Sequence, residues 1–552
     1  MAGIGFELKK LFKEESYTKR MKAYLYSAVV AAGPWLATVI SLNFLSMFAK
    51  TYFSDILQRN LFMGTIIYSF IFSMIITVPF QFLITRYISD CLYKKEYKNL
   101  GASFIGLNKI ILFITGLIGF IFYLNKPLPL YYKFFSIVLF MVISSIWILM
   151  VYLSTLKNFK IIIVSFFTGC LISIVLGYIL MNIPIKFYVY LYPTNLLLAF
   201  LVGMIVTLTM LLINFIKTFE LNLYHQYDFL KYFKFYKKIF FIGMFYTIGV
   251  WIHNFIIWFS EIGMVVYETY RFAPIYDSAV FLAYLTIIPS LTLFIVNVET
   301  NFYMKYKNYY GSIIKNASLD KINDAKKQMQ KSLYSEMFYI LEIQLIITIA
   351  LVVLSKIIFE YYNFPIIYRG IFQIAALGAF CNVFLLLTIM VLLYFDARTF
   401  AFFSASLFLI GNSFWTLYFL SKGLNFYGFG YFIGSLIAFV FAFLFLSICF
   451  KNLTYYTFFS QPLFVKKRVS RFEKVINYIT YYRFKFRKKV EFVTSYKYLI
   501  VVVILLIGAI FVLRDSELYK KYRADRETFK SGQKNANIEK TMGFEGREEN
   551  RF

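Results

Sequence analysis

Aromatic rings and carboxylates recur between residues 251 and 278 in a pattern that suits carbohydrate binding. The stretch reads WIHNFIIWFSEIGMVVYETYRFAPIYDS. Proteins commonly hold sugars between an aromatic face, which stacks on the apolar side of the ring, and acceptors that bind the hydroxyl groups. Trp258 could provide such a face, and Asn254, Glu261 and Asp277 the acceptors. The pattern therefore marks a candidate sugar-binding segment.

The same residues have a second interpretation that needs no ligand. Tryptophan is enriched where a membrane helix meets the lipid headgroups, and for Trp258 taken alone we favour this interfacial position. His253 and Asn254 lie deeper in the apolar run. For these two residues we expect a polar interior of the protein.

Arg86 and Asp90 form a charged pair in the sequence TRYISD, near the end of another apolar run. Their i, i+4 spacing suits an ion pair on one face of a helix. Such a pair could act as a gate that breaks and re-forms during transport. We favour the simpler alternative, in which the arginine anchors the helix end and the pair lies at the surface.

Glu299 stands at or just inside the end of the apolar run LTLFIVNVETNFYMK. A carboxylate at membrane depth is costly and usually faces the interior of a helix bundle. It could bind hydroxyl or amide groups of a substrate, or take up protons. The alternative is a pair with a lysine near the headgroups, such as Lys305.

The tripeptide GPW at 33–35 interrupts the first apolar run. Proline removes one backbone hydrogen bond, and glycine lets a neighbouring helix approach closely. We therefore expect a helix break here, with Trp35 directly beside it.

Catalytic signatures are missing from the sequence. HExxH, GxSxG, the P-loop, the glycine-rich dinucleotide motif and a loop DxD are all absent, and there are two histidines. The four cysteines lie in or beside apolar runs with no CxxC pair, so neither a zinc site nor a disulfide framework is indicated. We expect no enzyme activity, metal or cofactor, and an ion gradient, a substrate gradient or a partner must drive any transport.

The composition shows which elements must carry these residues. The 552-residue chain is 60% hydrophobic and has a mean hydropathy of +0.68. Its apolar residues fall in runs of about 20, the length that a helix needs to cross a hydrocarbon core of about 30 Å. We therefore predict an all-α integral membrane protein.

Twelve spans form the predicted core, and a thirteenth follows them. The core divides into two six-helix bundles, 23–216 and 238–450, joined by a basic linker at 217–237. Pro79 and Pro289 each fall in the second helix of a bundle, a faint internal repeat typical of transporters. The remaining segments are expected to be an amphipathic surface helix at 1–22, a basic segment at 451–497, an extra transmembrane helix at 498–513 and a polar tail at 514–552.

The distribution of lysine and arginine predicts the orientation. The formal net charge is +29, and lysine and arginine gather in alternate loops. Cytoplasmic loops of membrane proteins carry such an excess of lysine and arginine, so we assign the basic loops to the cytoplasmic side. This explains the charge without nucleic acid, and basic segments beside the membrane can also contact anionic lipids. The prediction is a multi-pass protein of the plasma or inner membrane with a cytoplasmic N-terminus.

Several strings of the sequence together resemble the PelG family. They are MAGIGFELKKLF, AAGPWL, TRYISDCLY and PIYDSAVFLAYLTIIPSLTLFIVNVETNFYMKYKNYYGSI, which contains the pair Glu299–Thr300. The resemblance implies a twelve-helix transporter of the multidrug/oligosaccharidyl-lipid/polysaccharide flippase superfamily. It also implies export of Pel, an N-acetylhexosamine-rich biofilm polysaccharide, beside a PelF-like cytosolic glycosyltransferase and PelD-like and PelE-like membrane proteins.

With this resemblance, the candidate residues form a hypothetical path. A nascent hexosamine polymer would be received near Arg86, Asp90 and Glu299, would pass Trp35, Asn254 and Trp258, and would leave beside Glu261 and Asp277. Three alternatives stay open: a cation-coupled small-molecule antiporter of the same superfamily, a membrane polymerase or ligase, and a scaffold that anchors the synthase.

Overall fold

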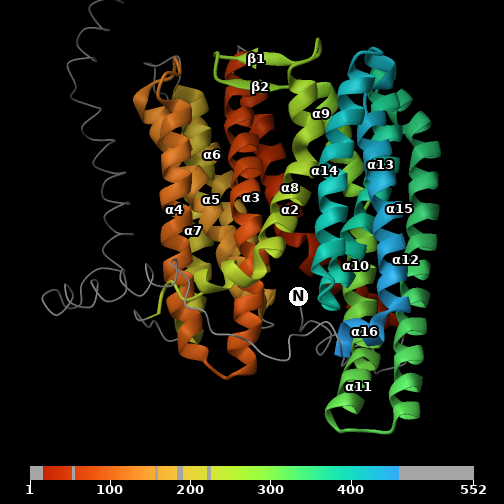
Figure 1. Ribbon diagram of the computed structural model, residues 1–552. Coiled ribbons are helices and arrows are strands. Elements are labelled where there is room, and N and C mark those ends of the chain that lie inside the picture. Colours follow the sequence, from red (N-terminus) through yellow and green to blue (C-terminus); the bar gives the residue numbers. More distant parts are fainter. Residues whose placement is uncertain (1–16, 53–55, 156–158, 183–190, 220–224, 459–552) are drawn as a thin grey trace, which may run out of the picture. The chain divides into compact units, whose positions relative to one another are not determined.

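Long apolar runs become helices because only a helix satisfies every backbone group within one segment in lipid. The computed structural model describes residues 17–458 except 53–55, 156–158, 183–190 and 220–224 (Figure 1). The first half contains α2 (Tyr17–Tyr52), α3 (Ile56–Tyr93), α4 (Tyr97–Tyr123), α5 (Leu130–Thr155), α6 (Phe159–Asn182) and α7 (Leu191–Thr218). The second half contains α8 (Leu230–Trp258), β1 (Met264–Val266), β2 (Tyr270–Phe272), α9 (Pro274–Leu285), α10 (Ile288–Asn297), η1 (Val298–Phe302), α11 (Tyr303–Ile314), α12 (Leu319–Tyr361), α13 (Ile366–Tyr394), α14 (Arg398–Leu420), η2 (Leu424–Phe426), α15 (Phe429–Lys451) and α16 (Leu453–Phe458).

Twelve stretches among the described residues are long and apolar enough to cross a membrane. This confirms the twelve predicted spans. Helix α8 begins at Leu230, within the segment expected as a linker. Of the surface helix expected at 1–22, residues 17–22 form the start of α2, and the rest lies outside the described residues. The extra helix at 498–513, the polar tail and nearly all of the basic segment at 451–497 also fall outside them.

The two halves repeat one packing pattern. In the first half α2 packs on α6, α4 on α5, α6 on α7 and α5 on α7, and in the second half α8 packs on α14, α12 on α13, α14 on α15 and α13 on α15. Between the halves, α3 contacts α8 and α2 contacts α10, so the first helix of each half meets the second helix of the other. This reciprocity is the packing expected of two related six-helix bundles.

The prolines affect these helices differently. In the second half, the equivalent of α3 is divided into α9 and α10, and Pro289 lies in the first turn of α10. In the first half, α3 continues through Pro79. The expected break at Pro34 is wrong, because α2 is continuous there, and the Thr38 hydroxyl donates to the Pro34 carbonyl oxygen at 2.9 Å.

Small residues bring the fifth and sixth helices of each half into close contact. A Cβ atom at Gly203 would lie 2.3 Å from the Gly169 carbonyl oxygen across the α6–α7 contact. In the equivalent α14–α15 contact, a Cβ atom at Gly434 would lie 2.6 Å from the Asn412 Cα. Packing of this kind drives helix association in lipid, where apolar side chains gain little from leaving the solvent.

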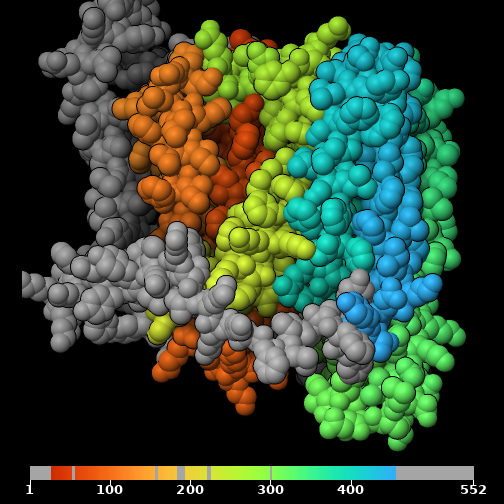
Figure 2. All heavy atoms as spheres, in the orientation of Figure 1, coloured from red at the N-terminus to blue at the C-terminus, as the bar shows by residue number. Residues whose placement is uncertain are grey.

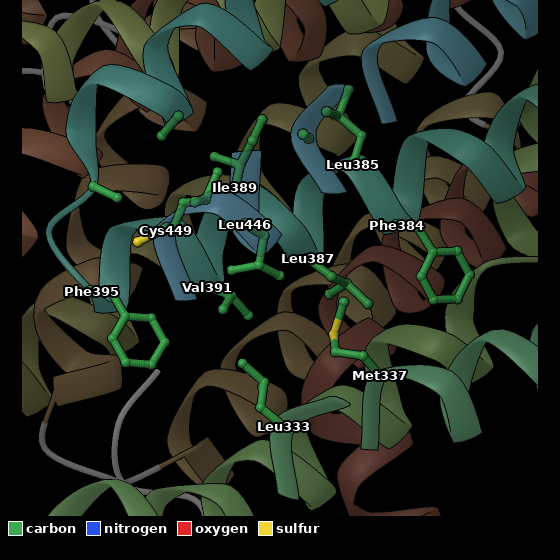
Figure 3. Packing of buried hydrophobic residues seen from close by; sticks show 14 of the residues in the cluster. Leu333, Met337, Phe384, Leu385, Leu387, Ile389, Val391, Phe395, Leu446 and Cys449 are labelled. Carbon is green, nitrogen blue, oxygen red and sulfur yellow. The ribbon is translucent and has the colours of Figure 1, made fainter. Parts of the chain in front are cut away.

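The apolar core of the second half lies among α12, α13 and α15. Figure 3 shows Leu333 and Met337 of α12 beside Leu387 and Val391 of α13, with Leu446 of α15 close by. All five side chains are buried. This core gives α13 a fixed position between its neighbours.

Helix α12 is far longer than a membrane span requires. It has 43 residues, which corresponds to about 65 Å at 1.5 Å per residue. Its first part packs on α11, and the two form a helical hairpin at the bottom of Figure 1. Asn301 Nδ2 donates to Glu336 Oε1 at 2.9 Å where the hairpin joins the bundle.

Candidate functional site

A short β-hairpin joins α8 to α9 at the top of the molecule in Figure 1. Its strands pair antiparallel, with Met264 opposite Phe272 and Val266 opposite Tyr270. Glu268 in the turn has φ of 48°, in the left-handed region, as tight hairpin turns require. The hairpin places the predicted residues that precede it close to those that follow it.

Asp277 lies in the first turn of α9 and accepts hydrogen bonds from three residues. Trp258 Nε1 donates to both carboxylate oxygens at 2.9 Å, and Asn254 Nδ2 donates to Oδ1 at 2.7 Å. The backbone N–H of Ala273 donates to Oδ2 at 2.9 Å. Three of the residues predicted to bind a sugar are therefore bonded to one another.

Trp258 does not occupy the interfacial position that we favoured. Its side chain is 3% exposed, and its ring stacks on Tyr68 of α3 with centroids 5.2 Å apart. The indole N–H that a belt residue would present to headgroups is used by Asp277. Trp258 thus links the second half to the first at this end of the bundle.

The predicted polar interior around His253 and Asn254 is confirmed. His253 is fully buried; its Nδ1 lies 2.7 Å from the Tyr276 hydroxyl, and its ring stacks on Tyr431 with centroids 4.3 Å apart. Tyr431 in turn accepts from Asn382 Nδ2 at 3.0 Å. Sequence reasoning missed both tyrosines, since Tyr276 lies on α9 and Tyr431 on α15, and only the fold brings their rings to His253.

Asn254 and Glu261 present unused polar atoms at the same end. Asn254 is 3% exposed, and its Oδ1 atom has no donor among the described residues. Glu261 lies exposed in the turn that precedes β1. Both side chains can accept a hydrogen bond from a hydroxyl or an amide.

Trp35 lies where the two halves meet. It is half-buried on α2 and packs edge-to-face on Phe281 of α9, with ring centroids 5.6 Å apart. Its position is therefore consistent with a residue that faces a path between the halves.

Arg86 and Asp90 lie at the opposite end of α3 from the hairpin. The predicted i, i+4 ion pair is confirmed, with Nε and Oδ1 3.6 Å apart, and Tyr232 of α8 donates to Asp90 Oδ2 at 3.0 Å. The ring of Tyr236 interacts with two guanidinium groups, that of Arg86 at 5.4 Å and that of Arg398 at 4.3 Å. This second cluster also joins the halves.

The backbone of α8 departs from helical geometry at Tyr236, with φ of −124° and ψ of 28°. The sequence indicates no break here, because KFYKK contains neither proline nor glycine. Arg398 is the first residue of α14, directly after the short turn that follows α13. Its contact with Tyr236 depends on tertiary packing alone.

Glu299 falls in the π-helical segment η1, between α10 and α11. Such segments are rare, and they are frequent at functional sites because one extra residue re-aims the side chains that follow. The side chain of Glu299 itself is outside the described residues.

No group of three or more histidine, cysteine, aspartate or glutamate residues that could hold a metal occurs in the described part of the chain. The four cysteines are buried and unbridged. What the two clusters offer is aromatic faces, carboxylates, an amide and guanidinium groups, which suit the binding of polyhydroxylated molecules through many weak contacts.

Comparison with known proteins identifies both a family and a fold. The sequence model of PelG, described as an exopolysaccharide exporter (EPS-E), matches residues 1–458. No curated protein matches the chain. The match includes all twelve spans as well as both clusters.

Solved structures of transporters share the fold at low sequence identity. The bent form of the Vibrio cholerae MATE transporter VcmN superposes with a TM-score of 0.55 at 12% identity, covering 82% of this chain and 99% of that one. A MATE transporter in the straight conformation gives 0.54 at 14% identity, covering 78% and 96%. An outward-facing multidrug resistance MATE transporter of the MOP superfamily gives 0.53 at 14% identity, with the same coverage.

Proposed function

Because the chain belongs to the PelG family and has the fold of MOP-superfamily transporters, we propose that it exports the Pel exopolysaccharide across the plasma or inner membrane for a biofilm matrix. The family match along residues 1–458 carries this proposal. The polymer is rich in N-acetylhexosamine and is handed over by a cytosolic glycosyltransferase. The N-terminus is cytoplasmic, so α3 ends at the inner face and the β-hairpin lies at the outer face.

The two clusters support a path between the halves. Polymer enters near Arg86, Asp90 and the π-helical segment that contains Glu299. It passes Trp35 in the interface of α2 with α9 and leaves near the hairpin, where Asn254 and Glu261 have unused acceptors. Each contact is weak, which lets a polymer slide, whereas one tight site would stall it.

The inner face offers a docking surface for the synthase. Six lysines of the α11–α12 hairpin are exposed, and no ion pair among the described residues uses them: Lys305, Lys307, Lys315, Lys321, Lys327 and Lys331. The hairpin extends beyond the membrane span, so positive charge here reaches a cytosolic protein. We infer that a PelF-like glycosyltransferase docks on it, with PelD-like and PelE-like proteins as membrane partners.

The test uses a Pel-producing host whose own exporter gene is deleted and replaced by this one. Wild-type protein is expected to restore extracellular polymer, measured with a hexosamine-binding lectin. Asp277→Asn and Glu299→Gln are expected to reduce it, at equal protein level in the membrane. Glu342→Gln, which changes an exposed carboxylate of α12, is the matched control and leaves export unchanged.

Absence of restored polymer with well-expressed wild-type protein contradicts the proposal. Normal polymer with both variants removes Asp277 and Glu299 from the mechanism while leaving export intact.

The second candidate, cation-coupled export of small molecules, is favoured by the MATE-like fold. Movement of dyes by purified protein in liposomes under an ion gradient, without movement of oligosaccharide, supports that candidate instead.

A further inference from the structure

The β1–β2 hairpin belongs to the second half by sequence, yet it is buried against the first half. Figure 2 shows its yellow-green atoms at the top of the molecule against the orange and red atoms of the first half. Tyr270 of β2 is fully buried, as is Val266 of β1. The contacts of the hairpin are therefore made across the boundary that a transported molecule must pass.

Tyr270 inserts into a fitted pocket of the first half. Its ring lies against Gly64 of α3, where an added Cβ would be 3.1 Å from the ring. Its hydroxyl lies 2.9 Å from Thr65 Oγ1 and 2.5 Å from the Tyr123 hydroxyl. Burial raises the pKa of the Tyr270 phenol well above its usual value, so the group stays neutral and hydrogen-bonded.

Three further contacts hold the hairpin to the first half. The Tyr68 hydroxyl donates to the Arg271 carbonyl oxygen at 2.8 Å and lies 2.9 Å from the Arg271 amide nitrogen. Lys126 Nζ donates to the Glu268 carbonyl oxygen at 3.0 Å. All three contacts use backbone atoms of the hairpin, so they depend on its conformation more than on its side chains.

Asp277 fixes the base of the same hairpin. It binds Trp258, which precedes β1, and the backbone of Ala273, which follows β2. Trp258 also stacks on Tyr68, the residue that binds Arg271. The hairpin is thus held to the second half at its base and to the first half at Tyr270.

We propose that the β1–β2 hairpin is the outer gate of the exporter and that Tyr270 is the residue that closes it. Polymer leaves only when Tyr270 withdraws from the pocket formed by Gly64, Thr65 and Tyr123, so that the two halves separate at the outer face. This inference rests on the proposed export function and adds the exit site to it. The alternative is that the hairpin links the halves permanently. In that case a cross-link between the hairpin and the first half would leave export unchanged, whereas a gate that cannot open would stop it.

A disulfide between Gly64→Cys and Tyr270→Cys tests the gate directly. The Cβ built at Gly64 lies 3.3 Å from the Tyr270 Cβ, close to the 3.5–4.5 Å found in disulfides. Oxidation of the double variant in the exporting host is expected to lower extracellular polymer at least tenfold, and reductant is expected to restore it. Each single variant should export equally with and without oxidant, because the native cysteines are buried.

The matched control is a disulfide that stays within the first half. Gly177→Cys on α6 and Ala199→Cys on α7 place their Cβ atoms 3.8 Å apart, and the end of the Leu45 side chain, 2.5 Å from the added Cβ, has to move. The reduced form of this pair therefore sets its baseline, and oxidant is expected to leave export unchanged from that baseline. Unchanged export with the Gly64–Tyr270 disulfide fully formed overturns the gate while leaving the export function standing. Loss of export in wild-type protein as well would contradict the function instead.

A second variant covers the case in which the double variant does not fold. Thr65 is fully buried behind Tyr270. Thr65→Cys is therefore expected to react with a membrane-impermeant thiol reagent several times faster while polymer is being exported than when synthesis is blocked. Equal reaction rates in the two conditions contradict an opening at Tyr270.

Discussion

The carboxylate of Asp277 accepts four hydrogen bonds, and all of them come from residues that flank one hairpin. Its donors are an indole, an amide and a backbone N–H. Hydrogen bonds to a charged acceptor are each worth about 1.5–3 kcal/mol, and a buried donor left without one costs a similar amount. At the scale of single residues, these bonds give Asp277 a structural role at the base of the hairpin.

A double-mutant cycle on Asp277 and Trp258 measures this contribution. Asp277→Asn replaces one of the two carboxylate oxygens that accept hydrogen bonds by an amide group, which donates. Trp258→Phe removes the indole N–H but keeps an aromatic ring against Tyr68. Each change is expected to lower the free energy of unfolding by about 1–3 kcal/mol, and the pair by less than the sum. Thermal unfolding of the purified protein in detergent supplies the values. If the effects of the two single changes add exactly in the double variant, the Asp277–Trp258 hydrogen bond is contradicted.

The environment of Trp258 could not be predicted from the sequence. A tryptophan near the outer end of a span has the same sequence context whether it faces lipid or donates to a carboxylate 19 residues later. The residues that decide between the two, Tyr68 and Asp277, come from other helices. Burial of His253 and Asn254 was predictable, because polar groups deep in an apolar run have to face the protein.

At the scale of elements, the repeated contact between the fifth and sixth helices holds each half together. Gly203→Ala adds a methyl group 1.9 Å from Ser173 Oγ and 2.3 Å from the Gly169 carbonyl oxygen, so α6 and α7 must separate. We expect a large loss of monodisperse protein in size-exclusion chromatography and a lower Tm. Gly370→Ala in α13 is the control, since nothing lies within 4 Å of its Cβ. An equal effect of the two changes would contradict the packing argument.

The α11–α12 hairpin makes a prediction about recruitment. Replacing Lys315, Lys321 and Lys327 by glutamine removes exposed cations without disturbing a core contact. We expect the glycosyltransferase to co-purify at least several-fold less, and more so at low salt, where charge attraction is strongest. Lys50 near the end of α2 and Lys422 after α14 lie on the outer side in the proposed orientation, so glutamine at both positions gives the control. Undiminished co-purification of the triple variant would exclude this surface.

The number of membrane spans was predictable, and the irregularities of the helices were not. Hydropathy locates membrane spans because a segment that crosses the lipid has to be a long apolar helix. The sequence therefore predicted the twelve spans that the structure contains among its described residues. Pro34 indicates a break that packing overrides, while Tyr236 departs from helical geometry with no proline or glycine nearby. The π-helical segment at Glu299 likewise has no local signal that distinguishes it from a continuous helix.

At the scale of the whole molecule, the two halves meet through reciprocal contacts and are joined at both ends by aromatic and charged residues. One end uses Tyr236 between Arg86 and Arg398, and the other uses Tyr270 in its pocket. These joints connect residues that are more than 140 positions apart in the chain, so no short sequence window contains them. A transporter that alternates between inner and outer access needs joints at both ends, since one must hold while the other opens.

The proposed function requires that this molecule moves hexosamine polymer rather than small molecules. The most direct measurement reconstitutes purified protein in liposomes loaded with fluorescent N-acetylhexosamine oligosaccharides and follows their release, with the oxidised Gly64→Cys/Tyr270→Cys protein as the closed control. Release is expected to be well above that from loaded liposomes without protein, and absent from the closed control. Retention of the oligosaccharide while a cationic dye crosses under an ion gradient would contradict it.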